Sequence, residues 1–148
     1  MNVKVGEHPS AGKVEKRGNG KFSRKIMDGE FAISVEMPPP RGTAPGILRS
    51  KLDFVRNLAE SGLVDAVDMT DGSRGVPAMP PGDFISVVRS QLGPVAQSVE
   101  FIPHFATRDL NTMAMQARLI GYHATGIHTV LFVTGDPPEM PPAYPCST

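Results

Sequence analysis

The sequence has few of the features that mark secreted, membrane-bound or nucleic-acid-binding proteins. It has one cysteine, Cys146, which excludes an internal disulfide framework and a cysteine metal cluster and fits a reducing cytoplasm. Its formal net charge is zero, which argues against a nucleic-acid partner. It lacks the apolar core of a signal peptide and any run near the roughly 18 residues of a membrane span. We therefore expect a cytoplasmic protein that binds neither nucleic acid nor membrane.

Four short apolar runs in the chain each end in a polar residue, and these residues recur at a nearly constant interval. Glu36, Thr70, His104 and Asp136 lie 34, 34 and 32 residues apart. A period in this range, with a helical pattern between the runs, is typical of consecutive strand–helix units. Because helix-linked parallel strands all end on one face of the sheet, these four residues are expected to share one rim.

The hydrophobic pattern predicts which segments form strands and helices. Strands are expected over 31–37, 64–69, 99–103 and 129–133, after a short helical turn over 22–30. Helices are expected between them, with Gly62, Gly93 and Gly126 as stops. Asp83 is the expected N-cap of the second of these helices, and the third begins at Asp109 or Leu110. The apolar residues expected on the inner face of that third helix are Leu110, Met113, Ala117, Ile120 and Ala124.

This alternation of strands and helices predicts an α/β fold with a parallel sheet. A doubly wound sheet and a barrel share the pattern, but the regular spacing and a candidate residue after every strand favour the barrel. A (β/α)8 TIM barrel needs eight units in roughly 250 residues, and this chain has four. We expect an incomplete barrel over 22–148, preceded by a disordered leader over 1–21.

Glu36 is the first candidate catalytic residue. Val35, Met37 and three prolines surround it in the sequence, and apolar surroundings disfavour the charged form of a carboxyl, which favours a proton donor. The alternative is an ordinary surface glutamate on a loop. In the next loop, Thr70, Asp71 and Ser73 offer hydroxyls and a carboxylate that could hold a phosphate or ribose, although Asp-Gly is also a common turn pair.

The segment from His104 to Asp109 combines an imidazole, an aromatic ring and an arginine, which suits contact with a flavin or nucleotide. The alternative is a structural histidine beside an Arg108–Asp109 ion pair. A metal site would join His104 to Glu36 and Asp136, as in a metal-dependent hydrolase. Without a second nearby histidine we expect no metal.

The sharpest motif is Thr134-Gly135-Asp136, which two prolines follow. Gly135 permits close backbone approach and the prolines fix the loop, so Asp136 is held rigidly at the rim. There it can hydrogen-bond a ligand or tune its electronics.

Taken together, five segments resemble the amino-terminal half of methylenetetrahydrofolate reductases, in family order and with family spacing. They are FAISVEMPPPRG, VDAVDMTDGSRGVP, FIPHFATRDLN, QARLIGYHATGI and VLFVTGDPPEM. The resemblance implies an FAD-containing barrel enzyme. It implies that a hydride passes from NADH or NADPH through the flavin to 5,10-methylenetetrahydrofolate and yields 5-methyltetrahydrofolate.

The resemblance also implies roles for individual residues. Glu36 matches the general acid that assists opening of the folate's five-membered ring, and Asp136 matches the aspartate that modulates the flavin. The residues that match flavin-binding positions are Thr70, Asp71, Ser73, His104, Phe105, Thr134, Gly135 and Asp136. Thr134 replaces an arginine, and Asp71 an aromatic residue, of some members.

The family's remaining strands and folate-binding residues have no counterpart in this sequence. We therefore expect a truncated chain that is inactive by itself. The alternative is a non-catalytic product, or a half-barrel that pairs with another copy or with a complementing chain.

Overall fold

A computed structural model of the chain describes residues 20–137. Its four strands are β1 (Ser34–Met37), β2 (Ala66–Met69), β3 (Glu100–Ala106) and β4 (Leu131–Val133). Its α-helices are α1 (Lys21–Asp28), α2 (Pro45–Ser61), α3 (Pro81–Leu92) and α4 (Thr112–Ala124). Two short 3-10 helices, η1 (Ser73–Gly75) and η2 (Gly93–Ser98), complete the described part of the chain.

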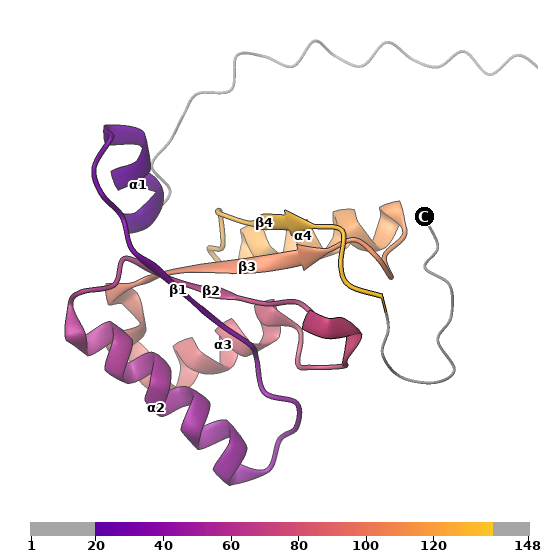
Figure 1. The fold of residues 1–148 in the computed structure, drawn as a ribbon, viewed down its shortest axis with the longest axis horizontal. Helices are drawn as coiled ribbons and strands as arrows, with labels where there is room; N and C mark the ends of the chain where they lie inside the picture. The colour runs from indigo at the N-terminus through magenta and orange to yellow at the C-terminus, as the bar shows by residue number, and fades with distance from the viewer. Residues whose placement is uncertain (1–19, 138–148) are drawn as a thin grey trace, which may run out of the picture.

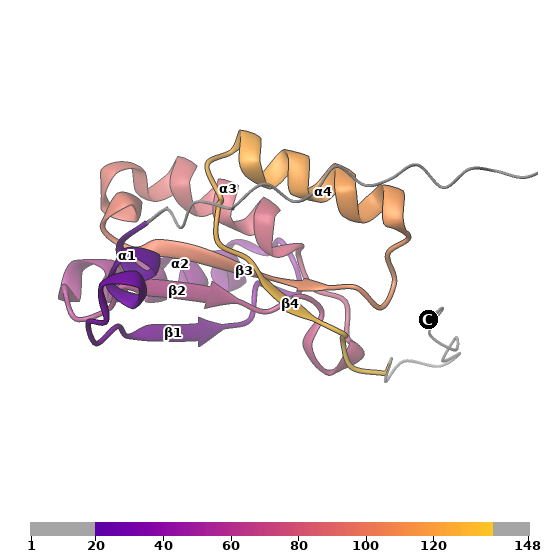
Figure 2. The same ribbon diagram turned by 90° about the horizontal axis from the view of Figure 1, so that it is seen from above.

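The four strands form one parallel sheet in which spatial order follows chain order, β1-β2-β3-β4. Helices α2, α3 and α4 cover one face of this sheet, and the other face is left open (Figures 1 and 2). A doubly wound sheet would reverse its strand order and carry helices on both faces. The α/β fold with the first units of a barrel is therefore confirmed, and the described sheet does not close.

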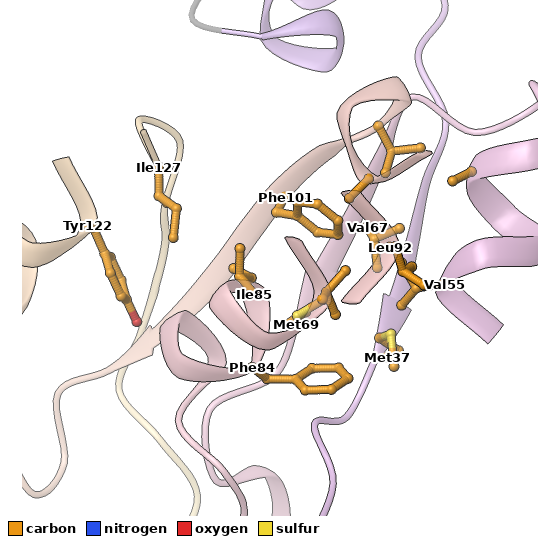
Figure 3. Packing of buried hydrophobic residues seen from close by; sticks show 14 of the residues in the cluster. Met37, Val55, Val67, Met69, Phe84, Ile85, Leu92, Phe101, Tyr122 and Ile127 are labelled. Atoms are coloured by element: carbon orange, nitrogen blue, oxygen red, sulfur yellow. The ribbon is translucent and has the colours of Figure 1, made fainter. Parts of the chain in front are cut away.

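The core lies between the sheet and these helices because alternate strand residues point toward them. Val67, Met69 and Phe101 on the strands pack against Val55 of α2 and Phe84 of α3 (Figure 3). Toward α4 the cluster continues through Tyr122 and Ile127. The packing depends on Gly82 in α3, since a Cβ at that position would lie 2.2 Å from a ring carbon of Tyr122.

The predicted elements all occur, with shifted ends. β1 begins three residues later than expected, whereas β3 continues to Ala106 and so includes His104. Two helix starts were wrong. Pro80 rather than Asp83 occupies the N-cap position of α3, because a proline at N1 suits the first turn. Asn111 caps α4, and its side-chain oxygen accepts a hydrogen bond from Ala114 N–H at 2.9 Å.

The predicted inner face of α4 was also wrong, except at Leu110, which precedes the helix and packs against the core. Met113 and Ile120 are 79% and 70% exposed, while Tyr122 is buried and Met115 and Leu119 pack against the core. Two apolar stripes exist on this helix, and the periodicity alone did not decide which of them meets the sheet. The exposed stripe lies on the side of α4 that no described element covers.

Helix α1 docks at the amino-terminal ends of the strands, apart from the other helices (Figure 1). Its Ser23 N–H donates to Glu100 Oε2 at 3.0 Å, and its Lys25 Nζ lies 3.0 Å from Asp65 Oδ2. This confirms the helical turn expected before the first strand. The leader expected over 1–21 lies mostly outside the described residues.

Among residues 20–137, no helix combines the length and the apolar character that a membrane-spanning segment requires.

Candidate functional site

The carboxyl ends of β2, β3 and β4 enclose a cavity of about 200 Å³. The sequence-predicted residues meet there as the strand–helix period implied, because the loops after parallel strands share one face of the sheet. Those that line the cavity are Thr70, Asp71, Ser73, His104, Thr134, Gly135 and Asp136, together with Val133. Two predicted residues, Glu36 and Phe105, do not line it.

The loop after β2 forms a tight polar turn at this cavity. The Thr70 hydroxyl donates to Ser73 Oγ at 3.4 Å, and Thr70 itself is buried. Gly72 and Arg74 both adopt the left-handed conformation, with φ of 57° and 61°. A non-glycine residue in this region stores about 1–3 kcal/mol of backbone strain, and such strain gathers at functional sites.

Asp136 is held where the TGDPP motif indicated. Its Oδ2 accepts a hydrogen bond of 2.6 Å from the Arg74 backbone N–H, and Arg108 donates to its carbonyl oxygen. Gly135 has φ of 92°, and a Cβ there would lie 3.0 Å from the Cβ of Arg108. A glycine is therefore required for β3 and the β4 loop to approach each other this closely.

Asp71 links neighbouring elements at the rim through hydrogen bonds. Its Oδ2 accepts hydrogen bonds from Ala106 N–H at 3.0 Å and from Arg118 Nη1 at 2.8 Å. These bonds join the β2 loop to the end of β3 and to helix α4. The carboxylate lines the cavity, but this oxygen is already used within the protein.

The prediction that the Phe105 side chain contacts a cofactor at this cavity is corrected. Phe105 is fully buried on the helix-covered face, where its ring meets Tyr122 edge-on at 6.1 Å and Phe132 at 5.0 Å. Strand alternation explains the error. Phe105 follows His104 in β3, so the two side chains point to opposite faces of the sheet.

Glu36 lies on the open face of the sheet, one residue before the end of β1. It is exposed, because Val35 and Met37 alternate away from it toward the helices. The apolar enclosure expected from the sequence is therefore not observed around Glu36 in the described structure. The carboxyl instead stands opposite Asp68, its register partner on β2.

Sequence reasoning missed Asp68. Its carboxylate belongs to a group with Glu36 and His104 in which one ligand atom of each residue lies within 4.8 Å of the others. The metal set considered from the sequence named Asp136 in place of Asp68. The available signal was strand alternation, because Asp68 precedes Thr70 by two residues and so shares its face.

The donor types at the cavity fit the polar edge of a flavin. Thr70, Ser73 and Thr134 supply hydroxyls, and the buried His104 Nε2 has no hydrogen-bond partner within the described structure. A flavin edge carries both donors and acceptors, which hydroxyls and an imidazole can satisfy. A cavity of about 200 Å³ accommodates only part of such a group, so the remainder would extend over the open face.

Comparison with known proteins agrees with the resemblance seen in the sequence. A family model described as methylenetetrahydrofolate reductase matches residues 21–144, which is more than half of the chain. No curated protein matches the chain. The matched span includes every described strand and every residue of the cavity.

Proposed function

The chain belongs to the methylenetetrahydrofolate reductase family, a family of oxidoreductases that are generally flavin-dependent, and we propose that it carries the flavin-binding rim of such an enzyme. The proposed cofactor is FAD, the electron donor is NADH or NADPH, and the substrate is 5,10-methylenetetrahydrofolate. The observation that carries the proposal is the meeting of Thr70 after β2, His104 near the end of β3 and Asp136 after β4 at one cavity beside the face that holds Glu36.

When bound, the flavin would accept a hydride from the nicotinamide and deliver it to the methylene carbon of the folate. The chain's own residues would hold and orient it. Thr70 and Ser73 would bind through their hydroxyls, and His104 through the Nε2 that lacks an internal partner. The Arg74 N–H keeps the Asp136 carboxylate at the cavity, where it would modulate the flavin's electronics.

Glu36 would supply the proton that opens the folate's five-membered ring. Its carboxyl is exposed on the open face, within 4.8 Å of a ring nitrogen of His104, which lines the cavity. A general acid must reach the atom that it protonates, and an exposed side chain on a rigid strand meets that requirement.

We further propose that full activity requires strands beyond the four described here. Leu131 and Phe132 of β4 are 46% and 57% exposed, and Met113 and Ile120 of α4 are also exposed. A barrel covers such an edge with the next strand–helix unit. The cover could come from the same barrel, from a second copy or from a complementing chain.

The test is to purify the protein, load it with FAD and record visible absorbance together with the solution mass. When the covering strands are present, we expect flavin absorbance that bleaches under anaerobic NADH or NADPH and returns on addition of methylenetetrahydrofolate. The chain alone should bind flavin without completing this cycle. Bleaching without return would contradict the folate assignment. A protein of the expected mass that binds no flavin would refute cofactor binding by this rim.

The Glu36→Gln variant separates the two half-reactions. We expect the folate-dependent return of absorbance to slow by roughly 10²–10⁴-fold, because the proton donor is lost. Bleaching by the nicotinamide should be unchanged. The matched control is Glu60→Gln, an exposed glutamate of α2 remote from the rim, which should leave both rates at the wild-type value.

A further inference from the structure

Glu36, Asp68 and His104 form a compact cluster on the open face of the sheet. Glu36 and Asp68 are register partners on neighbouring strands, and His104 Nε2 lies 4.0 Å from Asp68 Oδ2. One ligand atom from each of the three residues lies within 4.8 Å of the other two. All three side chains are carried by strands, so the backbone fixes their spacing.

The internal partners of this cluster do not satisfy its polar atoms. The side chains of His104 and Asp68 are only 10% and 18% exposed. Within the described residues, the buried atoms His104 Nε2 and Asp68 Oδ1 make no hydrogen bond. The Asp68 carboxylate receives one long hydrogen bond, of 3.5 Å, from the Ser34 hydroxyl. Buried polar atoms usually have hydrogen-bond partners. Two neighbouring buried atoms without partners therefore indicate that a ligand binds between them.

We propose that Glu36, Asp68 and His104 bind one divalent transition-metal ion, for which Zn²⁺ is the best match. The mixed set of one imidazole and two carboxylates suits zinc or manganese, whereas Mg²⁺ and Ca²⁺ prefer oxygen ligands alone. The charge also fits, because two carboxylates balance a divalent cation and a neutral imidazole adds none.

The geometry allows such an ion with small side-chain movements. Zinc ligands lie about 2.0–2.2 Å from the metal, which places neighbouring ligand atoms roughly 3.4 Å apart in a tetrahedral site. The 4.0 Å between His104 and Asp68 is close to this value. Glu36 is exposed and free to rotate toward the pair. Three protein ligands leave a fourth position open to water or to a ligand at the rim.

This inference stands apart from the proposed reductase function because metal binding is measured without flavin or folate. The two proposals share Glu36 and His104, because the same imidazole nitrogen is proposed to face the flavin when no metal is bound. A metal bound to the Glu36 carboxylate would withhold it from proton transfer, so we expect a zinc-loaded protein to lose the folate half-reaction.

The test is calorimetric titration of the metal-free protein with ZnCl₂, in a Cys146→Ser background that removes the competing thiol. We expect one saturable site per chain. His104→Gln, Asp68→Asn and Glu36→Gln should each weaken zinc binding by at least about tenfold. Substitution of Co²⁺ should give visible absorbance bands that the His104→Gln variant lacks.

Matched controls address the competing sites. The rings of His123 and His128 lie 5.0 Å apart at the other end of α4, so His128→Gln tests whether that pair binds the zinc. Asp53→Asn removes an exposed carboxylate remote from the cluster. Both controls should bind zinc as the wild type does.

The proposal is overturned if the protein has no saturable site, if His128→Gln abolishes binding, or if the three cluster variants bind normally. Should Asp68→Asn fail to fold, as judged by circular dichroism, the exposed Glu36→Gln variant decides.

Discussion

Asp65 precedes strand β2 and Asp68 lies within it, three residues further on. The two carboxylates differ in how many partners they have within the protein. Asp65 is 3% exposed and fully partnered: it accepts from the Ile33 N–H at 3.0 Å and lies 3.0 Å from Lys25 and 3.1 Å from Lys21. Asp68 has a long bond from Ser34, a 4.0 Å contact with His104 and one buried oxygen that makes no hydrogen bond in the described structure. One carboxylate stabilises the fold, and the other is available to a ligand.

The same difference separates the two ends of the sheet. At the amino-terminal end, Glu100 accepts hydrogen bonds from Ser23 N–H and from the Thr129 hydroxyl, so that α1, β3 and the segment before β4 are tied together. At the carboxyl end, His104 and Asp68 keep polar atoms without internal partners. Barrel folds concentrate stability at the amino-terminal face and chemistry at the carboxyl-terminal face, and this half-barrel follows that division.

The largest expected effect comes from one matched pair of substitutions. Asp65→Asn removes the charge that both lysines of α1 face, and we expect it to lower the melting temperature by roughly 5 °C, because charge-assisted hydrogen bonds are strong. Asp68→Asn removes a carboxylate with almost no internal partners, and we expect a change within about 2 °C. Thermal melting followed by circular dichroism measures both.

The exposed Asp53, which pairs with Arg56 on the surface of α2, supplies the control for this pair of variants. Asp53→Asn should shift melting by less than about 1 °C, since surface ion pairs contribute little. A larger loss from Asp68→Asn than from Asp65→Asn would show that the division between the two ends is wrong.

The sequence predicted the architecture better than the contacts. The 34-residue period placed Thr70, His104 and Asp136 at one rim because it reports topology, and topology alone decides which loops meet. Element ends were less accurate, since prolines and Asn111 fixed the helix starts locally. The buried face of α4 could not be chosen, because two apolar stripes compete on that helix.

Side-chain partners were beyond the sequence for a physical reason. In the sequence, Asp68 is a single polar residue within an apolar strand. Its position opposite Glu36 follows only from the register between β1 and β2. Phe105 was assigned to the rim as a neighbour of His104, although strand alternation sends the two side chains to opposite faces. The contact between Asp71 and Arg118 spans 47 residues, and no local pattern encodes it.

Acid should weaken the amino-terminal end selectively. The Ile33 N–H and the lysines of α1, Lys25 foremost, lower the pKa of Asp65 from 3.8 to about 2 in the folded protein. Because the folded pKa lies below the unfolded value, this stabilisation is complete above about pH 4 and is lost as the pH falls toward 2.

We therefore expect the melting temperatures of the wild type and of Asp65→Asn to differ most at neutral pH and to converge near pH 2. The measurement is a series of thermal melts from pH 7 to pH 2. A difference that stays constant across this range would mean that the carboxylate is not responsible for it. Asp53→Asn should track the wild type throughout.

The smallest expected effect concerns Asp71. This residue lies at the rim, but its carboxylate makes internal hydrogen bonds as the carboxylates at the amino-terminal end of the sheet do. Its Oδ2 joins the Ala106 N–H to Arg118, so Asp71→Asn should destabilise the fold by about 0.5 kcal/mol through the lost charge. The double variant Asp71→Asn/Arg118→Gln should cost less than the sum of the two single variants, because both remove the same ion pair. Urea unfolding of the four proteins measures this coupling. If Asp71→Asn left stability unchanged but weakened flavin binding, Asp71 would belong with Asp68 as a ligand residue. Its contacts with Ala106 and Arg118 would then contribute nothing to stability.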